Sequence, residues 1–386
     1  MSLKVLNIIG ARPQFVKCAV VSRAIRCHNE SADRRLIEEF ILHTGQHYDT
    51  NMSDIFLDEL KIKVNTNLGI REESHGKMTA AMLVGIENIL GKIIPDVVIV
   101  YGDTNSTLAG ALAASKVRIP VAHVEAGLRS FNMDMPEEIN RIVTDRLSTW
   151  LFCPTQTAVT NLRSEGVIAT EGNQATRRWY QHALNVGDVM YDAFLLYRKL
   201  GKVNCGLPEQ INGIESGFYL ATVHRTENID NPKRLRSIMT ALDEISNTTP
   251  VVLPIHPRTM KAIKSLNIEI SNIQIIEPVG YLDMLKLLYK CDAVFTDSGG
   301  LQKESFFAKK LCVTLRDETE WMELVENGFN LLAGASKDKI VAAVERLYRI
   351  PTDWDEAFYG DGRAGKKIVE TILKHQLSSN SNIVKK

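Results

Sequence analysis

The chain lacks the cysteine spacing that is typical of disulfide frameworks and metal sites. It has six cysteines in 386 residues, and no two of them have Cys-x-x-Cys spacing. Scattered cysteines of this kind are typical of reduced, buried thiols in cytosolic proteins. The sequence therefore predicts no disulfide framework, no metal site and a cytoplasmic location.

An excess of one charge and long hydrophobic runs are missing as well. Lys plus Arg and Asp plus Glu both number 46, so the formal net charge is zero. A balanced charge gives no electrostatic reason to expect a nucleic acid or an anionic membrane as a partner. No window approaches about 18 uninterrupted apolar residues, and no basic stretch followed by a long apolar run opens the sequence. We therefore expect neither a membrane span nor a signal peptide.

The usual dinucleotide fingerprint is also absent. The turn after the first apolar run reads Gly10-Ala11-Arg12-Pro13 in place of Gly-x-Gly-x-x-Gly. This argues against a redox dinucleotide, and we predict no cofactor. Arg12 and Lys17 are cations around this turn, where a phosphate could sit at a helix N-terminus. The alternative is an ordinary turn with two solvated basic side chains.

Short apolar runs alternate with helical patterns along most of the chain. Such alternation indicates parallel sheets in an α/β protein. The two blocks of this pattern predict two doubly wound domains that face each other across a cleft. We expect these domains over residues 1–184 and 185–364, a final helix over 365–377 that packs back on the first domain, and a frayed tail over 378–386.

The stretch from residue 97 to 141 organises the first domain. Val97–Tyr101 and Val121–Val124 are typical of buried strands, and the alanine-rich run between them is typical of a helix packed on a sheet. This βαβ unit places Asp103 and Glu125 at the carboxyl ends of neighbouring parallel strands. Open α/β sheets bind ligands at that edge, so we expect a ligand site there.

More carboxylates follow close behind. Glu137 and Glu138 precede Arg141 by about one helical turn. Carboxylates that converge on one edge, with cations near them, have separated pKa values and can supply acid and base roles. The plainer interpretation is that Asp103 caps the next helix and that Glu137 or Glu138 pairs with Arg141. The residues alone leave both interpretations open.

A second ligand-binding pattern lies in the later block. Asp297-Ser298-Gly299-Gly300 follows an apolar run and precedes a helical pattern. Free N–H groups at a helix start bind anions, and glycines let a phosphate approach the backbone closely. We favour phosphate binding over an ordinary strand–helix turn. Glu304 would then lie within the first turns of the helix, placed for a ribose hydroxyl.

Two histidines end strand patterns in the second domain. His224, followed by Arg225, is a candidate acid or phosphate ligand, and a hydrogen-bonded structural histidine is the alternative. His256, in Pro-Ile-His-Pro, has the same two interpretations. We favour the structural interpretation for His256.

Seven motifs in a fixed order carry a family resemblance. They are Gly-Ala-Arg-Pro-x-x-x-Lys (10–17), Gly-Asp-Thr-x-Ser-Thr-Leu-Ala-Gly (102–110), His-Val-Glu-Ala-Gly-Leu-Arg (123–129), Pro-Glu-Glu-x-Asn-Arg (136–141), Val-His-Arg-x-Glu-Asn (223–228), Asp-Ser-Gly-Gly-x-Gln-x-Glu (297–304) and Leu-Arg-Asp-x-Thr-Glu (315–320). Each motif is weak alone. The ordered set, which covers about residues 4–378, resembles the non-hydrolysing UDP-N-acetylglucosamine 2-epimerases.

The resemblance implies a fold and a reaction. The fold is two Rossmann-like domains in the glycosyltransferase-B arrangement, with the nucleotide held mainly by the second domain, in a homodimer. The reaction is reversible inversion of C2 of UDP-N-acetylglucosamine, through elimination and re-addition of UDP, for surface polysaccharide precursors. It requires no cofactor and no metal. The rival interpretations are a hydrolysing epimerase, a retaining glycosyltransferase and a catalytically silent nucleotide-sugar sensor.

The resemblance also divides the candidate residues by role. Asp103, Glu125 and Glu137 are the acid–base and charge-stabilising groups, while His224 and Lys17 attend the leaving group. The substrate-binding residues are Arg12, Arg141, Arg225, Ser298, Gly299, Gly300, Glu304 and Arg316. Which carboxylate serves which face of C2 stays open.

Some positions depart from the common family pattern. Ala11 and Gln14 stand where many relatives have Thr and Glu, and segment 130–135 is shorter than the common form. Together with segment 320–324, these departures resemble the branch that acts on UDP-2,3-diacetamido-2,3-dideoxyglucuronate. That sugar carries a carboxylate and would need an extra cation, which the sequence does not identify. Both sugars stay open as substrates.

Overall fold

The computed structural model describes most of the chain. The described residues are 2–31, 36–46, 57, 60–72, 74–167, 181–199, 211, 217–347, 354 and 357–383. They divide into two compact units, which we describe separately. Unit 1 comprises Met1–Ala193 and Ala357–Lys386, and unit 2 comprises Phe194–Glu356.

Unit 1 is built on a parallel sheet whose seven described strands follow the order β3-β2-β1-β4-β5-β6-β7. The strands are β1 (Leu3–Ile9), β2 (Ile37–His43), β3 (Thr66–Asn67), β4 (Val97–Tyr101), β5 (Val121–Val124), β6 (Trp150–Cys153) and β7 (His182–Asn185). Every residue of β4 and β5 is buried, as expected for strands covered on both faces. β1 pairs with β2 on one side and with β4 on the other. The strand order therefore reverses between β1 and β4, and ligands bind at such a switch point.

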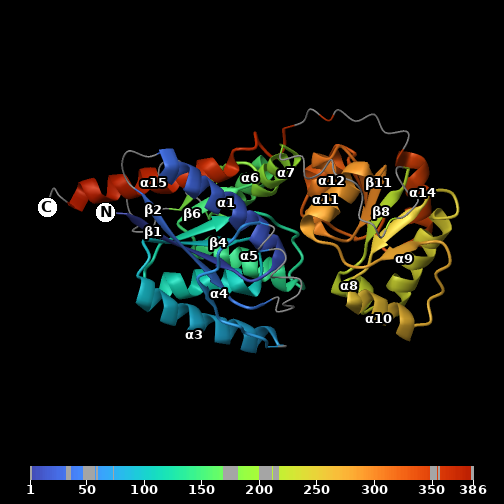
Figure 1. Cartoon of the computed structure of the whole chain (residues 1–386), viewed down its shortest axis with the longest axis horizontal. Helices are drawn as coiled ribbons and strands as arrows, with labels where there is room; N and C mark the ends of the chain where they lie inside the picture. The colour runs from blue at the N-terminus through green and yellow to red at the C-terminus, as the bar shows by residue number, and fades with distance from the viewer. Residues whose placement is uncertain are drawn as a thin grey trace. The chain divides into compact units, whose positions relative to one another are not determined.

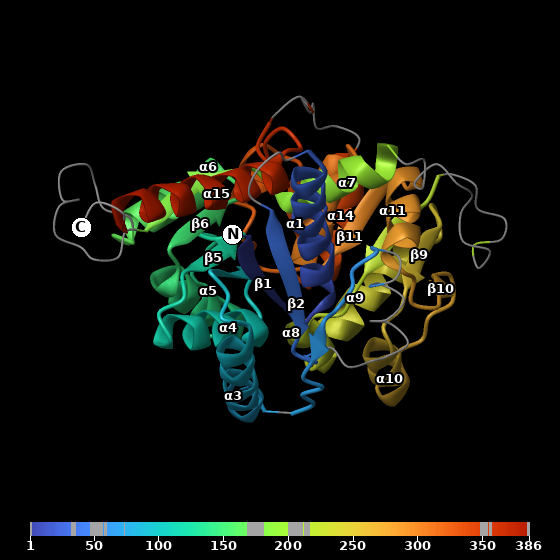
Figure 2. The same ribbon diagram turned by 60° about the vertical axis from the view of Figure 1, so that its left-hand side comes forward.

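Helices cover both faces of this sheet. They are α1 (Arg12–Ser31), α3 (His75–Ile93), α4 (Asn105–Lys116), α5 (Pro136–Leu147), α6 (Gln156–Ser164), the start of α7 (Val189–Lys199) and α15 (Ala364–Ile383). Figures 1 and 2 show α1 and α15 on one face, and α3, α4 and α5 on the other. A Cβ at Gly110 would lie 3.0 Å from the side chains of Ile8 and Val100. The alanine-rich α4 therefore packs closely against β1 and β4.

Unit 2 repeats the arrangement with six described strands in the order β10-β9-β8-β11-β12-β13. Its strands are β8 (Tyr219–Thr222), β9 (Val251–Pro254), β10 (Gln274–Ile276), β11 (Ala293–Thr296), β12 (Leu311–Thr314) and β13 (Asn330–Leu332). Its helices are the end of α7, α8 (Thr226–Ile229), α9 (Pro232–Ile245), α10 (Pro257–Ser265), α11 (Tyr281–Lys290), α12 (Gly299–Phe307), α13 (Met322–Glu326) and α14 (Lys337–Leu347). β8 pairs with β9 and with β11, all parallel. The switch point of unit 2 therefore lies between β8 and β11.

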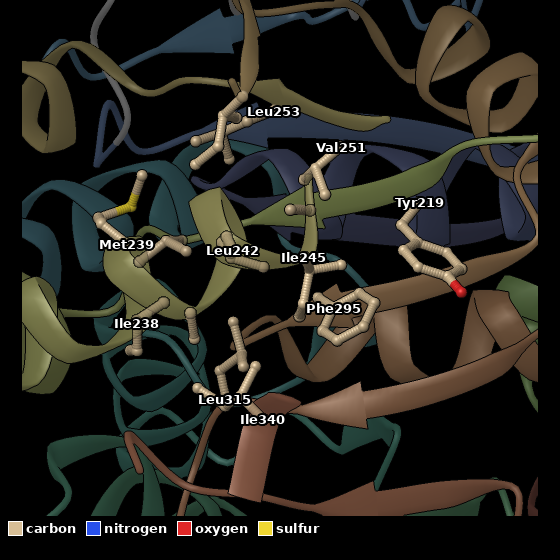
Figure 3. Packing of buried hydrophobic residues seen from close by; sticks show 14 of the residues in the cluster. Tyr219, Ile238, Met239, Leu242, Ile245, Val251, Leu253, Phe295, Leu315 and Ile340 are labelled. Carbon is tan, nitrogen blue, oxygen red and sulfur yellow. The ribbon is translucent and has the colours of Figure 1, made fainter. Parts of the chain in front are cut away.

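The core of unit 2 shows why its strands are short and apolar. Figure 3 shows Leu242 and Ile245 of α9 packed toward the sheet beside Phe295. The ring centroids of Tyr219 and Phe295 are 5.4 Å apart. Ile340 of α14 is fully buried in the same cluster. Burial of such side chains stabilises the sheet by about 1.5–3 kcal/mol each.

The structure corrects several expected element boundaries. The last helix does not end at residue 377, because α15 continues to Ile383. Residues 378–383 contain no Gly or Pro that would stop a helix. The sequence predicts a strand over residues 185–188, whereas strand β7 is His182–Asn185. The sequence also predicts a helix over residues 53–60 and a loop over residues 169–182; most of that helix and residues 169–180 of that loop lie outside the described residues.

In the described part of the chain, none of the helices is both long enough and apolar enough to span a bilayer.

Candidate active site

Two residues from different elements form a buried ion pair at the carboxyl edge of the unit 1 sheet. Glu125 directly follows β5, and its carboxylate accepts a hydrogen bond from the ammonium of Lys17 on α1. Glu125 has a φ of +75°, an unusual conformation for a residue with a side chain. Strained backbone of this kind concentrates at functional sites. The conformation turns the Glu125 side chain back toward α1.

Gly102 makes this ion pair possible. Its φ is +62°, which favours glycine. A Cβ at Gly102 would lie 3.1 Å from the Lys17 ammonium and 3.3 Å from a Glu125 carboxylate oxygen. Any larger residue would therefore disturb the pair. The glycine lies between β4 and Asp103, so it also sets the direction of the chain at Asp103.

A second ion pair lies beside the first. Asp103 follows β4, and one of its carboxylate oxygens lies 3.0 Å from both Nε and Nη2 of Arg141 on α5. The same guanidinium donates to Glu138, whose side chain is buried. Asn140 on α5 also donates to the carbonyl oxygen of Asp103, at 2.8 Å. Helix α5 therefore holds Asp103 through two side chains one residue apart.

The two adjacent glutamates of α5 have different environments. Glu138 is fully buried, and it accepts hydrogen bonds from the backbone N–H groups of Ser130 and Phe131 at 3.0–3.1 Å. Glu137 is half-buried, and it has no hydrogen bond or ion pair to any other described residue. Of the two alternatives for the Arg141 partner, the structure selects Glu138. The carboxylate of Glu137 is not paired with any side chain or backbone group of the described residues.

The turn after β1 does not offer its first backbone N–H groups to an anion. The side-chain oxygen of Gln14 accepts from Gly10 and Ala11 at 2.7 Å and 3.0 Å. The side-chain nitrogen of Gln14 donates to the Tyr101 carbonyl oxygen at 2.7 Å. Arg12 is the first residue of α1 and is half-buried. The group that could attract a phosphate at this turn is therefore the positive charge of Arg12, and not these two N–H groups.

A buried network of alternating charge underlies β5, and sequence reasoning missed it. His123 lies 2.7 Å from Asp145 of α5, and Arg129 lies 2.8 Å from the other carboxylate oxygen of Asp145. Arg129 also forms two hydrogen bonds to Glu165, at 2.7 Å and 2.8 Å. Burial alone would raise the pKa of Asp145, but the hydrogen bonds and charges of His123 and Arg129 lower it below its ordinary value. The sequence signal that could have revealed this network is the occurrence of His123 and Arg129 in one motif.

Asp297 organises the carboxyl edge of the unit 2 sheet. It follows β11 and is fully buried. Its carboxylate accepts from the backbone N–H groups of His224 and Arg225 at 3.0–3.1 Å and from the Asn228 side chain at 3.1 Å. The His224 ring nitrogen Nδ1 lies 3.3 Å from the same carboxylate. The sequence marked Asp297 only as a strand end, whereas the structure makes it the group that holds the His224 turn.

The first N–H groups of helix α12 are not used by the described part of the protein. Ser298 caps the helix, and its hydroxyl accepts from the Leu301 N–H at 3.4 Å. The N–H groups of Gly299 and Gly300 have no partner among the described residues. A Cβ at Gly299 or Gly300 would meet protein atoms no closer than 3.6 Å, and neither glycine has a positive φ. The protein's own packing therefore does not require glycine at either position.

Arg225, Arg316 and Glu304 lie around this helix start. A Cβ at Gly299 would be 3.7 Å from Nη2 of Arg225 and 3.6 Å from a carboxylate oxygen of Glu320. Arg316 is fully buried and lies 3.0 Å from Glu320. Burial would lower the pKa of Arg316, but the charges of Glu320, Glu227 and Glu318 raise it, so Arg316 stays positively charged. Glu304, in the second turn of α12, is buried.

Two further sequence predictions concern a histidine and metal ions. His256 caps α10, where its Nδ1 accepts from the Arg258 N–H at 3.2 Å. This cap agrees with the structural interpretation of His256. No group of three or more potential ligands within the described ranges could hold a metal ion.

The architecture assigns the chain to a class. The two parallel-sheet α/β units have the glycosyltransferase-B-like fold. The glycosyltransferase SnogD from Streptomyces nogalater is 11% identical, with a TM-score of 0.51 over 97% of this chain and 99% of that one, a likeness of fold alone. The UDP-N-acetylglucosamine 2-epimerase of Neisseria meningitidis, solved with UDP-N-acetylglucosamine bound, is 32% identical with a TM-score of 0.83, over 96% of this chain and all of that one.

The sequence comparisons give the family. Residues 29–373 match the family model for UDP-N-acetylglucosamine 2-epimerase. The UDP-2,3-diacetamido-2,3-dideoxy-D-glucuronate 2-epimerase of Pseudomonas aeruginosa is 50% identical, over 96% of this chain and all of that protein. The UDP-N-acetylglucosamine 2-epimerase of Methanocaldococcus jannaschii, solved with UDP-N-acetylglucosamine and UDP, is 40% identical with a TM-score of 0.84, over 96% and 100% of the two chains. The chain therefore belongs to the UDP-N-acetylglucosamine 2-epimerase family, whose members are carbohydrate isomerases, and the resemblance seen in the seven motifs is confirmed.

Proposed function

We propose that this protein is a non-hydrolysing UDP-sugar 2-epimerase. The observation that carries the proposal is the pair of carboxylate–cation contacts, Lys17–Glu125 and Asp103–Arg141, at the ends of two adjacent strands. Family membership supplies the class of reaction. The product would be a precursor of surface polysaccharide.

The chemistry needs charged groups of both signs. The C2 proton of the sugar is not next to a carbonyl group, so it becomes acidic only as the C1–O bond to UDP breaks and positive charge develops on the ring. In the proposed reaction UDP departs and the C2 proton is lost, which leaves a 2-acetamidoglucal. A proton then returns to the opposite face of C2, and UDP re-adds to C1. Asp103, Glu125 and Glu137 stabilise the developing positive charge and move the proton.

Glu137 suits an acid–base role because its carboxylate has no protein partner among the described residues. Glu125 is held by Lys17 and Asp103 by Arg141, so these two carboxylates have fixed positions. A proton must be removed from one face of C2 and delivered to the other, which requires at least two such groups.

Unit 2 is proposed to hold UDP. The N–H groups of Gly299 and Gly300, which have no partner among the described residues, and the charge of Arg225 suit a diphosphate at the start of α12. His224, oriented by Asp297, would attend the leaving oxygen. Glu304 would bind the ribose. Arg12 and Arg316 add positive charge to their respective units.

The two candidate sugars differ by a carboxylate. UDP-N-acetylglucosamine is the substrate we propose, and the 50% identical Pseudomonas relative favours UDP-2,3-diacetamido-2,3-dideoxyglucuronate as the alternative. We further propose a cytoplasmic homodimer, for which the free cysteines in the described regions support the compartment. Light scattering of the purified protein tests the dimer, and a mass of one chain would refute it.

Incubation in deuterated water tests the reaction. The enzyme is given each UDP-sugar separately, and proton NMR follows C1 and C2. We expect one sugar to yield an intact UDP-sugar with inverted C2 and deuterium at C2. Release of free sugar would instead indicate a hydrolysing epimerase. No change in either sugar would refute the proposal.

A further inference from the structure

Trp321 lies against the first turn of α12, where we assign the diphosphate. Only 4% of this residue is exposed. Its indole N–H donates to the carbonyl oxygen of Gly299, the first residue of α12, at 2.9 Å. An indole N–H can only donate and a peptide carbonyl can only accept, so the direction of this hydrogen bond is fixed. The bond joins the segment that follows β12 to the start of α12.

Further contacts hold the indole ring in place. The ammonium of Lys303, on α12, lies 4.1 Å from the centroid of the Trp321 ring, within the range of a cation–π interaction. The Thr319 hydroxyl accepts from the backbone N–H of Trp321 at 3.3 Å and donates to the side-chain oxygen of Gln302 at 2.7 Å. Lys303, Thr319 and Gln302 are all buried. The indole N–H is therefore held against the backbone of α12 by both the ring and the main chain of Trp321.

The hydrogen bond from Trp321 acts on one peptide group. The Gly299 carbonyl and the Gly300 N–H belong to the same peptide, which is trans, so the two groups point in opposite directions. The Gly300 N–H has no hydrogen-bond partner among the described residues. A donor to the carbonyl polarises the peptide and makes its N–H a stronger donor. Trp321 therefore orients the Gly300 N–H and strengthens it as a donor.

The side chains around Gly299 suit an anion at this peptide. A Cβ at Gly299 would lie 3.7 Å from Nη2 of Arg225 and 3.7 Å from Nε1 of Trp321. The same position is 3.6 Å from a carboxylate oxygen of Glu320, but Glu320 is paired with the buried guanidinium of Arg316 at 3.0 Å. The negative charge of Glu320 is therefore offset, and the cation of Arg225 remains beside the peptide that Trp321 holds.

We propose that Trp321 is a positioning residue for the diphosphate of the UDP-sugar: its indole N–H holds the Gly299–Gly300 peptide so that the Gly300 N–H donates to a phosphate oxygen. The inference rests on the proposed function, which assigns UDP to unit 2. In this role Trp321 acts through the peptide and not on the phosphate itself. Loss of the indole N–H should therefore weaken binding of the phosphates and leave binding of the uridine part unchanged.

Binding of UDP and of uridine, which lacks the phosphates, to Trp321→Phe tests the role without requiring turnover. Phenylalanine keeps an aromatic ring beside Lys303 but has no N–H. We expect the Kd for UDP to rise about threefold to tenfold, the effect of one hydrogen bond, and the Kd for uridine to stay within about twofold of the parent. Trp150→Phe is the matched control, because Trp150, on β6 of unit 1, is also 4% exposed. The control should bind both ligands like the parent.

Two results with Trp321→Phe would overturn the role. One is a Kd for UDP within about twofold of the parent. The other is an equal weakening of UDP and uridine binding, which would indicate general damage to unit 2. If the unmodified protein binds no UDP, the proposed function fails together with this inference. If it binds UDP and epimerises neither sugar, the function alone fails, and the comparison of UDP with uridine still decides the role of Trp321.

Nitrogen NMR of the unmodified protein, labelled at its indole groups, gives a second test that does not need the variant to fold. The chain has four tryptophans, and the signal of Trp321 is the one that survives replacement of each of the other three by Phe. An anion that accepts from the Gly300 N–H makes the Gly299 carbonyl a stronger acceptor. The Trp321 indole proton should therefore move downfield as UDP binds, and not as uridine binds. No downfield movement with UDP, or the same movement with uridine, would overturn the proposal.

Discussion

Replacement of Gly300 by alanine separates ligand binding from folding at the start of α12. Gly300 is the second residue of that helix and is exposed, and a Cβ there would have its nearest protein atom at 3.9 Å. Its φ is not positive, so alanine fits the existing backbone. Alanine is favoured over glycine in a helix by roughly 0.5–1 kcal/mol. The free energy of unfolding should therefore stay the same or rise.

UDP binding should move in the opposite direction. The added methyl group occupies the space over the N–H groups of Gly299 and Gly300, to which we assign the diphosphate. Loss of one hydrogen bond to a charged group costs about 1.5–3 kcal/mol. At about 1.4 kcal/mol per tenfold change, the Kd for UDP should rise roughly ten- to hundredfold.

Titration calorimetry with UDP and urea unfolding give the two quantities on the same protein. Gly76→Ala is the matched control, because Gly76 is also the second residue of a helix and has nothing within 4 Å of its Cβ position. The control should bind UDP like the parent. Unchanged UDP affinity in Gly300→Ala would show that the diphosphate does not lie at the start of α12.

Three further predictions concern unit 1. Gly102→Ala should lower the free energy of unfolding by about 1–2 kcal/mol, because the φ of +62° is unfavourable for alanine, and should lower kcat; parent-like stability in urea would contradict it. Arg129→Met should lower the free energy of unfolding by about 3–5 kcal/mol, since it removes the guanidinium that pairs with the buried carboxylate of Asp145 and with Glu165; a loss below about 1 kcal/mol by the same measurement would refute the charge network. Burial raises the pKa of Asp192 from 3.8 to about 6, so its protonated form stabilises the fold below about pH 4 and this stabilisation is lost as pH rises through 6. Asp192→Asn should therefore gain stability relative to the parent between pH 4.5 and pH 7; a pH-independent difference would exclude this carboxyl as the cause.

The fold could be predicted largely because buried parallel strands have a strong signal. The predicted strands Val97–Tyr101 and Val121–Val124 are confirmed residue for residue, and so is the α/β class. Elements held by distant contacts escaped prediction. Strand β3 is only Thr66–Asn67, a polar edge strand that extends β2. Helix α8 has four residues, and the turn before it is held by Asp297, about 70 positions later in the chain.

The site could be predicted in its residue types but not in its pairings. The motifs contain Asp103 and Arg141, yet their contact joins residues 38 positions apart. The sequence also does not show whether Glu137 or Glu138 pairs with Arg141, because that depends on which side of α5 faces the sheet. The two contacts of His123 likewise come from a carboxylate and a carbonyl oxygen in other parts of the chain. Such relations follow from packing, which a single sequence does not specify.

Hydrogen exchange at C2 in Glu125→Gln tests the central claim, that carboxylates of unit 1 perform the sugar chemistry while unit 2 holds UDP. The variant and the parent are incubated with UDP-N-acetylglucosamine or its diacetamido-glucuronate relative in deuterated water, and UDP affinity is measured on both proteins. We predict that the parent incorporates deuterium at C2 of one sugar, whereas Glu125→Gln incorporates none and binds UDP with the affinity of the parent. Parent-like incorporation of deuterium by Glu125→Gln would contradict the claim.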